Sequence, residues 1–144
     1  MEIDIAGYTH DLMALTVKDM YPGLVHGVDF VVAHMIDEET GSQKGDPFIL
    51  AWKSKAHTQP TDEEVHARFR ANEVALRAAY IRSLRNEALS NTDHRTTSPP
   101  DAPVTLTKNV DAWRTYRQAL RDVTQQEGFP FNVVWPERPD TSGD

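Results

Sequence analysis

An apolar strand pattern followed by a helix start is the feature that most limits how this chain can fold. Residues 48–52 read Phe-Ile-Leu-Ala-Trp, and such bulky side chains suit a pleated, half-buried strand. Pro60 cannot continue a strand ladder, whereas Thr61 can cap the free N–H groups of a new helix and Glu64 can reach back to the Thr61 N–H. The sequence therefore predicts a strand-to-helix hinge formed by four residues: Trp52, Pro60, Thr61 and Glu64.

Two further elements are predicted before this hinge. Residues 11–20 place apolar side chains at helical spacing, with Thr9 or Asp11 available as the cap. Residues 28–36 predict a first strand, which the polar, glycine-containing segment 37–47 joins to the second. A two-stranded antiparallel unit is marginal in water, so a helix or a further strand must cover it.

A long helix is predicted from Thr61 to about Leu89, because nothing in this range breaks it. Its apolar residues form two adjacent stripes, one of Val65, Phe69, Leu76 and Tyr80 and the other of Val74, Ile81, Leu84 and Ala88. The hairpin is too small to cover both stripes. The second stripe, which contains Ile81 and Leu84, must then pack within its own domain, on a C-terminal helix or on another chain.

The last third of the chain has a different composition. Residues 91–108 predict a flexible linker, since prolines and polar residues dominate its first part. Asn109 or Asp111 can then cap a final helix, which Gly128 ends, and the prolines at 130 and 136 require an extended segment between them. Three parts follow from this pattern: a domain of residues 1–90, the linker, and a module of residues 109–144.

Together these elements predict an α+β fold. It consists of an N-terminal helix, a small antiparallel β-hairpin, a long central helix and a C-terminal helical module. At 144 residues, the chain has room for one ordinary domain or for a small domain with an appendage.

Aromatic and apolar residues beyond the linker are the candidates for partner binding. They have little local core to bury them, and aromatic rings beside arginines are typical of binding hot spots. The candidates are Trp113, Tyr116, Leu120, Phe131, Val133 and Trp135, together with Ile81 and Leu84 of the long helix. The alternative is that the C-terminal aromatic residues fold back onto the long helix.

Charge and motif content argue against several other functions. Residues 1–60 carry nine acidic residues against four basic ones, which is the opposite of a nucleic-acid-binding surface. The chain has no cysteine, no apolar run of membrane-spanning length and an acidic start unlike a signal peptide. The six histidines lack metal-ligand spacing, and no catalytic or nucleotide-binding motif occurs. We therefore expect no enzyme activity, metal or cofactor.

Two motifs carry a family resemblance. The strand ending in Trp52, the link and Pro60-Thr61-x-x-Glu64, with Met20-Tyr21-Pro22-Gly23 upstream, resemble the XkdW-like tail-assembly chaperones of tailed phages over about residues 12–70. Trp113-x-x-Tyr116-Arg117-x-x-Leu120-Arg121-Asp122, followed by Val133-Val134-Trp135-Pro136, is similar to the C-terminal signature of phage tail-fibre assembly proteins. Residues 71–110 match neither motif.

The resemblance implies a phage tail or tail-fibre assembly chaperone. Such a protein binds a fibre or tail subunit without covalent chemistry and assists its folding or oligomerisation, in the host cytoplasm during assembly. The resemblance leaves open a homo-oligomer and retention on the virion tail. One alternative is a permanent structural component of the tail or fibre, and another is a small antitoxin-like regulatory dimer.

Overall fold

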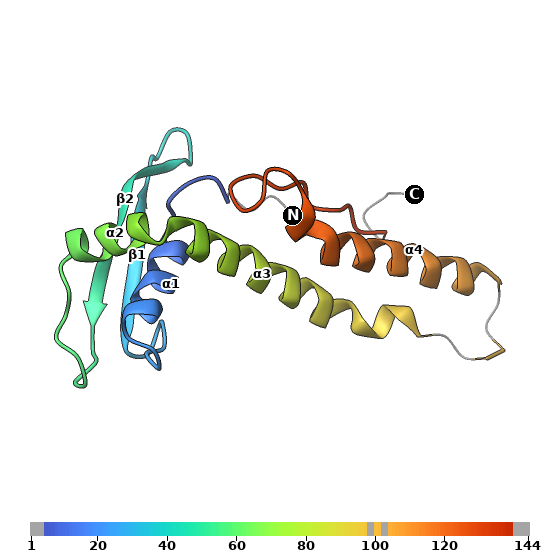
Figure 1. Ribbon diagram of the computed structural model, residues 1–144, viewed down its shortest axis with the longest axis horizontal. Helices are drawn as coiled ribbons and strands as arrows, with labels where there is room; N and C mark the ends of the chain where they lie inside the picture. The colour runs from blue at the N-terminus through green and yellow to red at the C-terminus, as the bar shows by residue number, and fades with distance from the viewer. Residues whose placement is uncertain (1–4, 98–99, 102–103, 140–144) are drawn as a thin grey trace. The chain divides into compact units, whose positions relative to one another are not determined.

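The computed structural model describes residues 5–97, 100–101 and 104–139. The chain divides into two compact units, an N-terminal unit within Glu2–Tyr80 and a C-terminal unit within Ile81–Asp144 (Figure 1). The elements are α1 (His10–Met20), β1 (Phe30–Ile36), β2 (Gln43–Trp52), α2 (Asp62–Ala71), α3 (Glu73–Thr92), the 3-10 helix η1 (Asp93–Thr96), α4 (Val104–Arg121) and the 3-10 helix η2 (Asp122–Gln125). Helices together with an antiparallel hairpin confirm the predicted α+β class.

Helix α1 supplies one side of the N-terminal core. It begins after Thr9, whose backbone is extended but whose hydroxyl forms no capping hydrogen bond. Leu12, Met13 and Val17 are fully buried along its inner face. The chain turns after the helix at Gly23, where φ is +101°, a conformation that glycine adopts without steric cost. The bounds of α1, His10–Met20, confirm the N-terminal helix predicted over residues 11–20.

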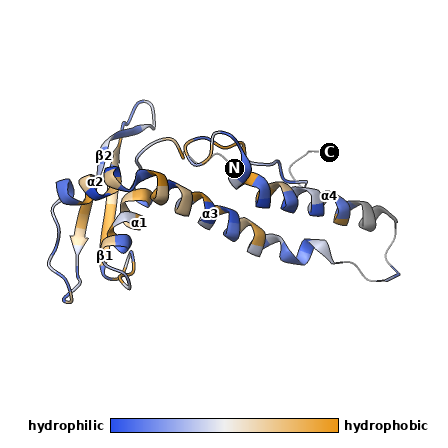
Figure 2. Ribbon diagram, in the orientation of Figure 1, coloured by the Kyte–Doolittle hydropathy of each residue, from blue (hydrophilic) through white to orange (hydrophobic). Residues whose placement is uncertain are grey.

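The hairpin packs its inner face on helices α1 and α2. Strands β1 and β2 pair antiparallel, with Phe30 opposite Trp52 and Val32 opposite Ile49. These side chains join a core cluster that also contains Met13, Val17, Leu24 and Val65. Figure 2 shows the apolar character of β1 and of the second half of β2. Because α1 and α2 bury this face, the two strands gain the cover that an isolated hairpin lacks.

Side chains close both outer edges of the hairpin at its middle. The Val32 N–H donates to Nε2 of His26 at 3.2 Å, and the Ile49 N–H donates to Oδ1 of Asp62 at 2.8 Å. Pro47, which has no N–H, is buried on the same strand as Ile49. Unpaired strand edges attract other strands, and each of these contacts satisfies one outward N–H group of the hairpin.

The predicted hinge between strand and helix is present. Thr61 has extended backbone angles, and its hydroxyl accepts the Glu64 N–H at 3.1 Å, which confirms Thr61 as the helix cap. Trp52 packs against the core and donates its indole N–H to the His57 carbonyl at 2.9 Å. Pro60, which lies between His57 and Thr61 in the sequence, is buried.

The prediction of one unbroken helix from Thr61 to Leu89 is wrong at Asn72. The backbone of Asn72 leaves the helical region, with φ −125° and ψ 23°, so that α2 ends at Ala71 and α3 begins at Glu73. The Asn72 side-chain amide donates to the Arg68 carbonyl at 3.1 Å. Asparagine side chains compete in this way with backbone hydrogen bonds, which favours helix ends.

In the C-terminal unit, the second half of α3 and helix α4 run side by side in opposite directions (Figure 1). Helix α3 continues to Thr92, η1 follows it, and α4 begins at Val104 rather than near Asn109. Both helices therefore extend into the segment predicted as a linker. Helix α4 also ends at Arg121, before the predicted end at Gly128, because η2 occupies the next four residues.

Replacing Thr61 with Ala should lower the stability of the N-terminal unit. The substitution removes the hydroxyl that accepts the Glu64 N–H, and loss of such a cap costs about 0.5–2 kcal/mol. Thermal unfolding followed by circular dichroism measures the effect. Thr58→Ala, at an exposed position before the hinge, is the control. Equal melting temperatures for both variants would contradict a stabilising role for the cap.

Candidate functional site

The aromatic residues of the C-terminal unit form a buried cluster. Trp113, Tyr116 and Leu120 lie on one stripe of α4 and pack with Ala88, Leu89 and Trp135. The rings of Trp113 and Tyr116 meet edge to face at 5.6 Å between centroids, a favourable geometry for aromatic pairs. Of the two alternatives from the sequence, the structure shows these three residues folded back onto the long helix.

Cationic side chains line the outside of this cluster. The guanidinium carbons of Arg95 and Arg138 lie 5.0 and 5.4 Å from the centre of the Trp113 ring. Such distances permit cation–π attraction. Arg138 belongs to the C-terminal segment, so this contact helps to hold that segment against α4.

The two residues of the predicted long-helix surface have different environments. Ile81 is 1% exposed and Leu84 is partly buried, whereas Val74 of the same predicted stripe is 59% exposed. Ala88 packs against the Trp113 cluster, which is one of the contacts that the sequence left open for this stripe. The second stripe therefore does not form one continuous exposed surface.

The extended segment after η2 presents two apolar side chains to solvent. The Gln126 side-chain amide forms two hydrogen bonds with the backbone of Val134, which we call the clamp. Its Nε2 donates to the Val134 carbonyl at 2.8 Å and its Oε1 accepts the Val134 N–H at 2.7 Å. Val133 is buried, Trp135 is partly buried, and Val134 and Phe131 are 76% and 47% exposed. The clamp therefore orients Val133 inward and Val134 outward.

Gly128 makes this segment sterically feasible. The Phe131 and Asn132 N–H groups both donate to its carbonyl, at 2.9 and 2.8 Å. A Cβ atom at this position would overlap the Asn132 carbonyl oxygen and lie 3.1 Å from the Asn132 Cβ. The tight turn thus depends on the absence of a side chain at residue 128.

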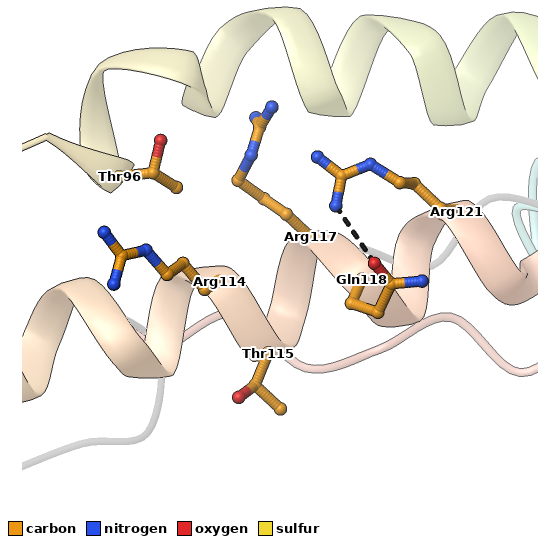
Figure 3. Close-up of a pocket in the computed structure, with 6 residues that line it drawn as sticks. All are labelled: Thr96, Arg114, Thr115, Arg117, Gln118 and Arg121. Atoms are coloured by element: carbon orange, nitrogen blue, oxygen red, sulfur yellow. Dashed lines mark hydrogen bonds between the residues drawn. The ribbon is translucent and has the colours of Figure 1, made fainter.

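An arginine-lined groove lies beside the aromatic cluster in the same unit (Figure 3). It encloses about 650 Å³, and its lining residues are Thr96, Arg114, Thr115, Arg117, Gln118 and Arg121. Positions 114, 117 and 121 share one face of a helix at the spacings 3 and 4. Figure 3 shows the three arginines and Thr96 around the groove, with the Thr115 side chain directed away from them.

Arg117 has a structural role at the floor of this groove. Its side chain is nearly buried, and Nη2 contacts Asp93 Oδ1 at 2.5 Å while Nη1 donates to Thr92 Oγ1 at 2.9 Å. Nη1 also donates to the carbonyl of Leu89, in the last turn of α3. A cation there satisfies carbonyls that have no helical partner. Arg117 therefore ties α4 to the end of α3.

The other two arginines are open to solvent. Arg114 pairs with Asp111 one turn before it, at 3.2 Å, and both side chains are mostly exposed. Arg121 donates to the Gln118 side-chain oxygen at 3.3 Å, a neutral partner. Exposed ion pairs contribute little stability, so these guanidinium groups can exchange their present partners for a ligand.

The N-terminal unit has exposed apolar side chains that sequence reasoning did not select. They are Val25, Val28, Met35, Ile36 and Leu50. All five lie on or near the hairpin, and the uninterrupted apolar character of residues 48–52 was the available signal that both strand faces carry apolar side chains. This surface is a second candidate for partner contact.

Two titratable groups of the N-terminal unit have shifted pKa values. Burial and the nearby Asp46 carboxylate raise the pKa of the Tyr8 hydroxyl well above its ordinary value, so it remains protonated at neutral pH. Backbone N–H groups of Thr40 and Glu39 donate to the Asp37 carboxylate and lower its pKa. These hydrogen bonds stabilise the turn that contains Asp37. Across residues 5–97, 100–101 and 104–139, no group of three His, Asp or Glu side chains could hold a metal.

Comparison with protein families agrees with this division of the chain. Residues 78–140 match the model described as phage tail assembly chaperone protein, and residues 13–75 match the model described as XkdW protein. Each match covers less than half of the chain, so the C-terminal unit is similar to phage tail assembly chaperone proteins and the N-terminal unit is similar to XkdW protein. No curated protein and no solved structure matches it.

The matched ranges refine the predicted resemblance. The XkdW match falls within the N-terminal unit, whereas the chaperone match covers most of the C-terminal unit, including the buried cluster and the arginine-lined groove. Residues 78–110 belong to the second match, so the expectation that residues 71–110 match neither family is wrong for most of this segment. None of the described helices is long and apolar enough to cross a membrane.

Replacing Arg117 with Met should destabilise the C-terminal unit. The variant keeps most of the side-chain volume but leaves the Leu89 carbonyl and Asp93 without their guanidinium partner. Hydrogen bonds to charged groups contribute about 1.5–3 kcal/mol, and urea unfolding followed by tryptophan fluorescence should show a loss of this size. Arg114→Met on the same helix is the matched control, with an expected change within about 0.5 kcal/mol. Equal losses would contradict the structural role of Arg117.

Gly128→Ala should disrupt the turn before the extended segment. The new Cβ overlaps backbone at Asn132, and overpacking of this kind costs about 1–3 kcal/mol. Amide hydrogen exchange should become faster at Asn132 and Val134, whose N–H groups are bonded in this turn and clamp. Gln125→Ala, at an exposed neighbouring position, should leave both exchange rates unchanged. Unchanged rates in the Gly128 variant would show that the turn tolerates a side chain.

Proposed function

We propose that this protein is an assembly chaperone, which binds a tail or tail-fibre subunit non-covalently and shields it until assembly. The observation that carries the proposal is the exposure of Val134 and Phe131 on a clamped segment of the unit that matches the chaperone family. Apolar side chains held outward on a fixed backbone lose little entropy when they bind. They are therefore suited to contact an apolar client surface.

The need for such a protein follows from the physics of fibre assembly. Subunits that await trimerisation or polymerisation expose apolar surface and unpaired strand edges, and these promote aggregation. A chaperone that covers them through a few apolar anchors gains its affinity from desolvation. Release then occurs when the assembling subunits compete for the same surface.

The predicted partner-binding residues divide into two groups under this proposal. Phe131 and the partly buried Trp135 contact the client, together with Val134. The buried residues pack in the interior of the C-terminal unit and hold the segment in place. They are Trp113, Tyr116, Leu120 and Val133. Ile81 and Leu84 contribute to the same unit through α3 rather than through a separate exposed stripe.

Introducing negative charge at the exposed apolar positions of this segment tests the proposal. Phe131→Glu combined with Val134→Glu places two carboxylates where an apolar client would pack. Loss of buried anchors worth about 2 kcal/mol or more should weaken binding at least about tenfold. The measurement is the soluble fraction of each tail and tail-fibre subunit of the same phage, co-expressed with wild-type or variant chaperone, followed by co-purification.

The matched control is Val74→Glu, an exposed apolar position of α3 in the N-terminal unit. It adds the same type of charge without altering the C-terminal segment, and it should keep wild-type client binding. Circular dichroism establishes that all variants remain folded. Full client solubility with the Phe131/Val134 variant would refute this surface as the binding site, whereas no effect of the wild-type protein on any tail subunit would refute the chaperone function itself.

A further inference from the structure

The arginine-lined groove has features of a binding site that the family resemblance does not explain. Charge is distributed unevenly along the chain: residues 2–80 contain thirteen acidic and seven basic residues, whereas residues 81–144 contain nine and eight. Within the second range, Arg114, Arg117 and Arg121 converge on one groove. A positive groove on a protein of net charge −7 therefore attracts anions locally, while the rest of the molecule repels them.

The internal partners of the three arginines leave two guanidinium groups available. Arg117 is nearly buried and is already satisfied by Asp93, Thr92 and Leu89. Arg114 and Arg121, on either side of it, have only an exposed ion pair and a neutral amide as partners. Arg117 thus fixes the position of the groove, and the two outer arginines can exchange their exposed partners for a ligand.

The spacing of these two arginines limits the shape of the ligand. They are seven residues apart on a helix, and at 1.5 Å per residue their attachment points are separated by about 10 Å. A peptide in the extended polyproline II conformation has three residues per turn and advances about 3.1 Å per residue, so carboxylates three positions apart lie on the same side and span about 9 Å. The planar guanidinium fork binds carboxylates in a bidentate manner.

The local charge favours a peptide over a nucleic acid. Asp93 and Asp111 already neutralise part of the positive charge around the groove. Nucleic-acid binding depends on many phosphate contacts along a continuous basic surface. A few carboxylates on a peptide match the limited excess of positive charge much better.

We infer that this groove binds an acidic, extended segment of the tail subunit, in which two carboxylates three residues apart contact Arg114 and Arg121. This inference rests on the proposed chaperone function and adds a polar specificity site to the apolar contact at Phe131 and Val134. Charge complementarity steers association and selects the partner more than it adds affinity. The groove therefore selects a client that carries this acidic pattern.

The inference is tested on the full chain with a synthetic peptide of four Glu-Ser-Gly repeats, which places carboxylates three residues apart. Its binding to ¹⁵N-labelled protein is followed by NMR chemical-shift changes, which detect millimolar affinity. Shifts should concentrate at Thr96, Arg114, Gln118 and Arg121 and should disappear in 0.5 M NaCl, where charges are screened. The corresponding Gln-Ser-Gly peptide should bind at least tenfold more weakly.

The variant pair separates a specific site from net charge. Arg114→Gln with Arg121→Gln should weaken peptide binding at least tenfold, whereas Lys53→Gln with Lys55→Gln changes the net charge equally at exposed positions of the N-terminal unit and should leave binding unchanged. Equal weakening by both pairs, or no binding of the Glu peptide by the wild-type protein, would overturn the inference. Equal or tighter binding of a twelve-residue oligothymidylate at the same residues would overturn it in favour of a general polyanion site.

Two further measurements distinguish the source of the acidic segment. Light scattering with the Arg114/Arg121 variant should show wild-type molecular mass, and a loss of self-association would mean that a second copy of this chain occupies the groove instead. In co-expression, the same variant should retain less tail subunit in solution than the wild-type protein does. If the wild-type protein and this variant solubilise the subunit equally, the inference fails while the chaperone function stands; if neither does, the chaperone function fails.

Discussion

The need to cover a two-stranded sheet shapes the whole N-terminal unit. Two strands bury too little apolar surface to be stable in water, so α1 and α2 must pack on the inner face that carries Phe30 and Val32. The position of α2 depends on one corner, where Thr61 caps the helix and the next residue, Asp62, accepts the Ile49 N–H of the strand. A helix start and a strand edge are thereby satisfied by adjacent residues. The same corner closes one edge of the hairpin, and His26 closes the other.

The C-terminal unit is held together by a different type of contact. Apolar packing between α3 and α4 is centred on Trp113, Tyr116 and Leu120, and the Arg117 guanidinium connects the end of α3 to the C-terminal part of α4. Helix ends have unsatisfied carbonyls, which a buried cation can compensate. Packing and charge thus act together at this junction. Leu89, Thr92 and Asp93 bind the Arg117 side chain in the interior of the unit. Arg114 and Arg121, one turn before and after it on the helix, are exposed at the surface.

These two modes of stabilisation leave distinct surfaces for interaction. Aromatic residues beside arginines in the sequence suggest a binding hot spot, but most of the rings serve here as the core of a small unit. What reaches the solvent is the outward side of the segment clamped by Gln126, together with the groove on α4. Under the proposed function this arrangement suits an assembly chaperone, since weak apolar and polar contacts would allow a client to be exchanged for its final partner. The affinity of each contact can be low when the client must later be released.

Local physical chemistry made much of the fold readable from the sequence, because caps, strands and turns depend on neighbouring residues. The strand ending at Trp52, the cap at Thr61 and the family motifs were all visible without coordinates. Tertiary contacts decided much of the rest. The burial of Trp113 depends on α3, more than twenty residues earlier. The break at Asn72 is local, since its side-chain amide donates to the Arg68 carbonyl four residues before it, but the periodicity of the apolar residues continues across it. Exposure, and therefore the candidate binding surface, could not be predicted from periodicity alone, because it is a property of the partners that each face meets in space.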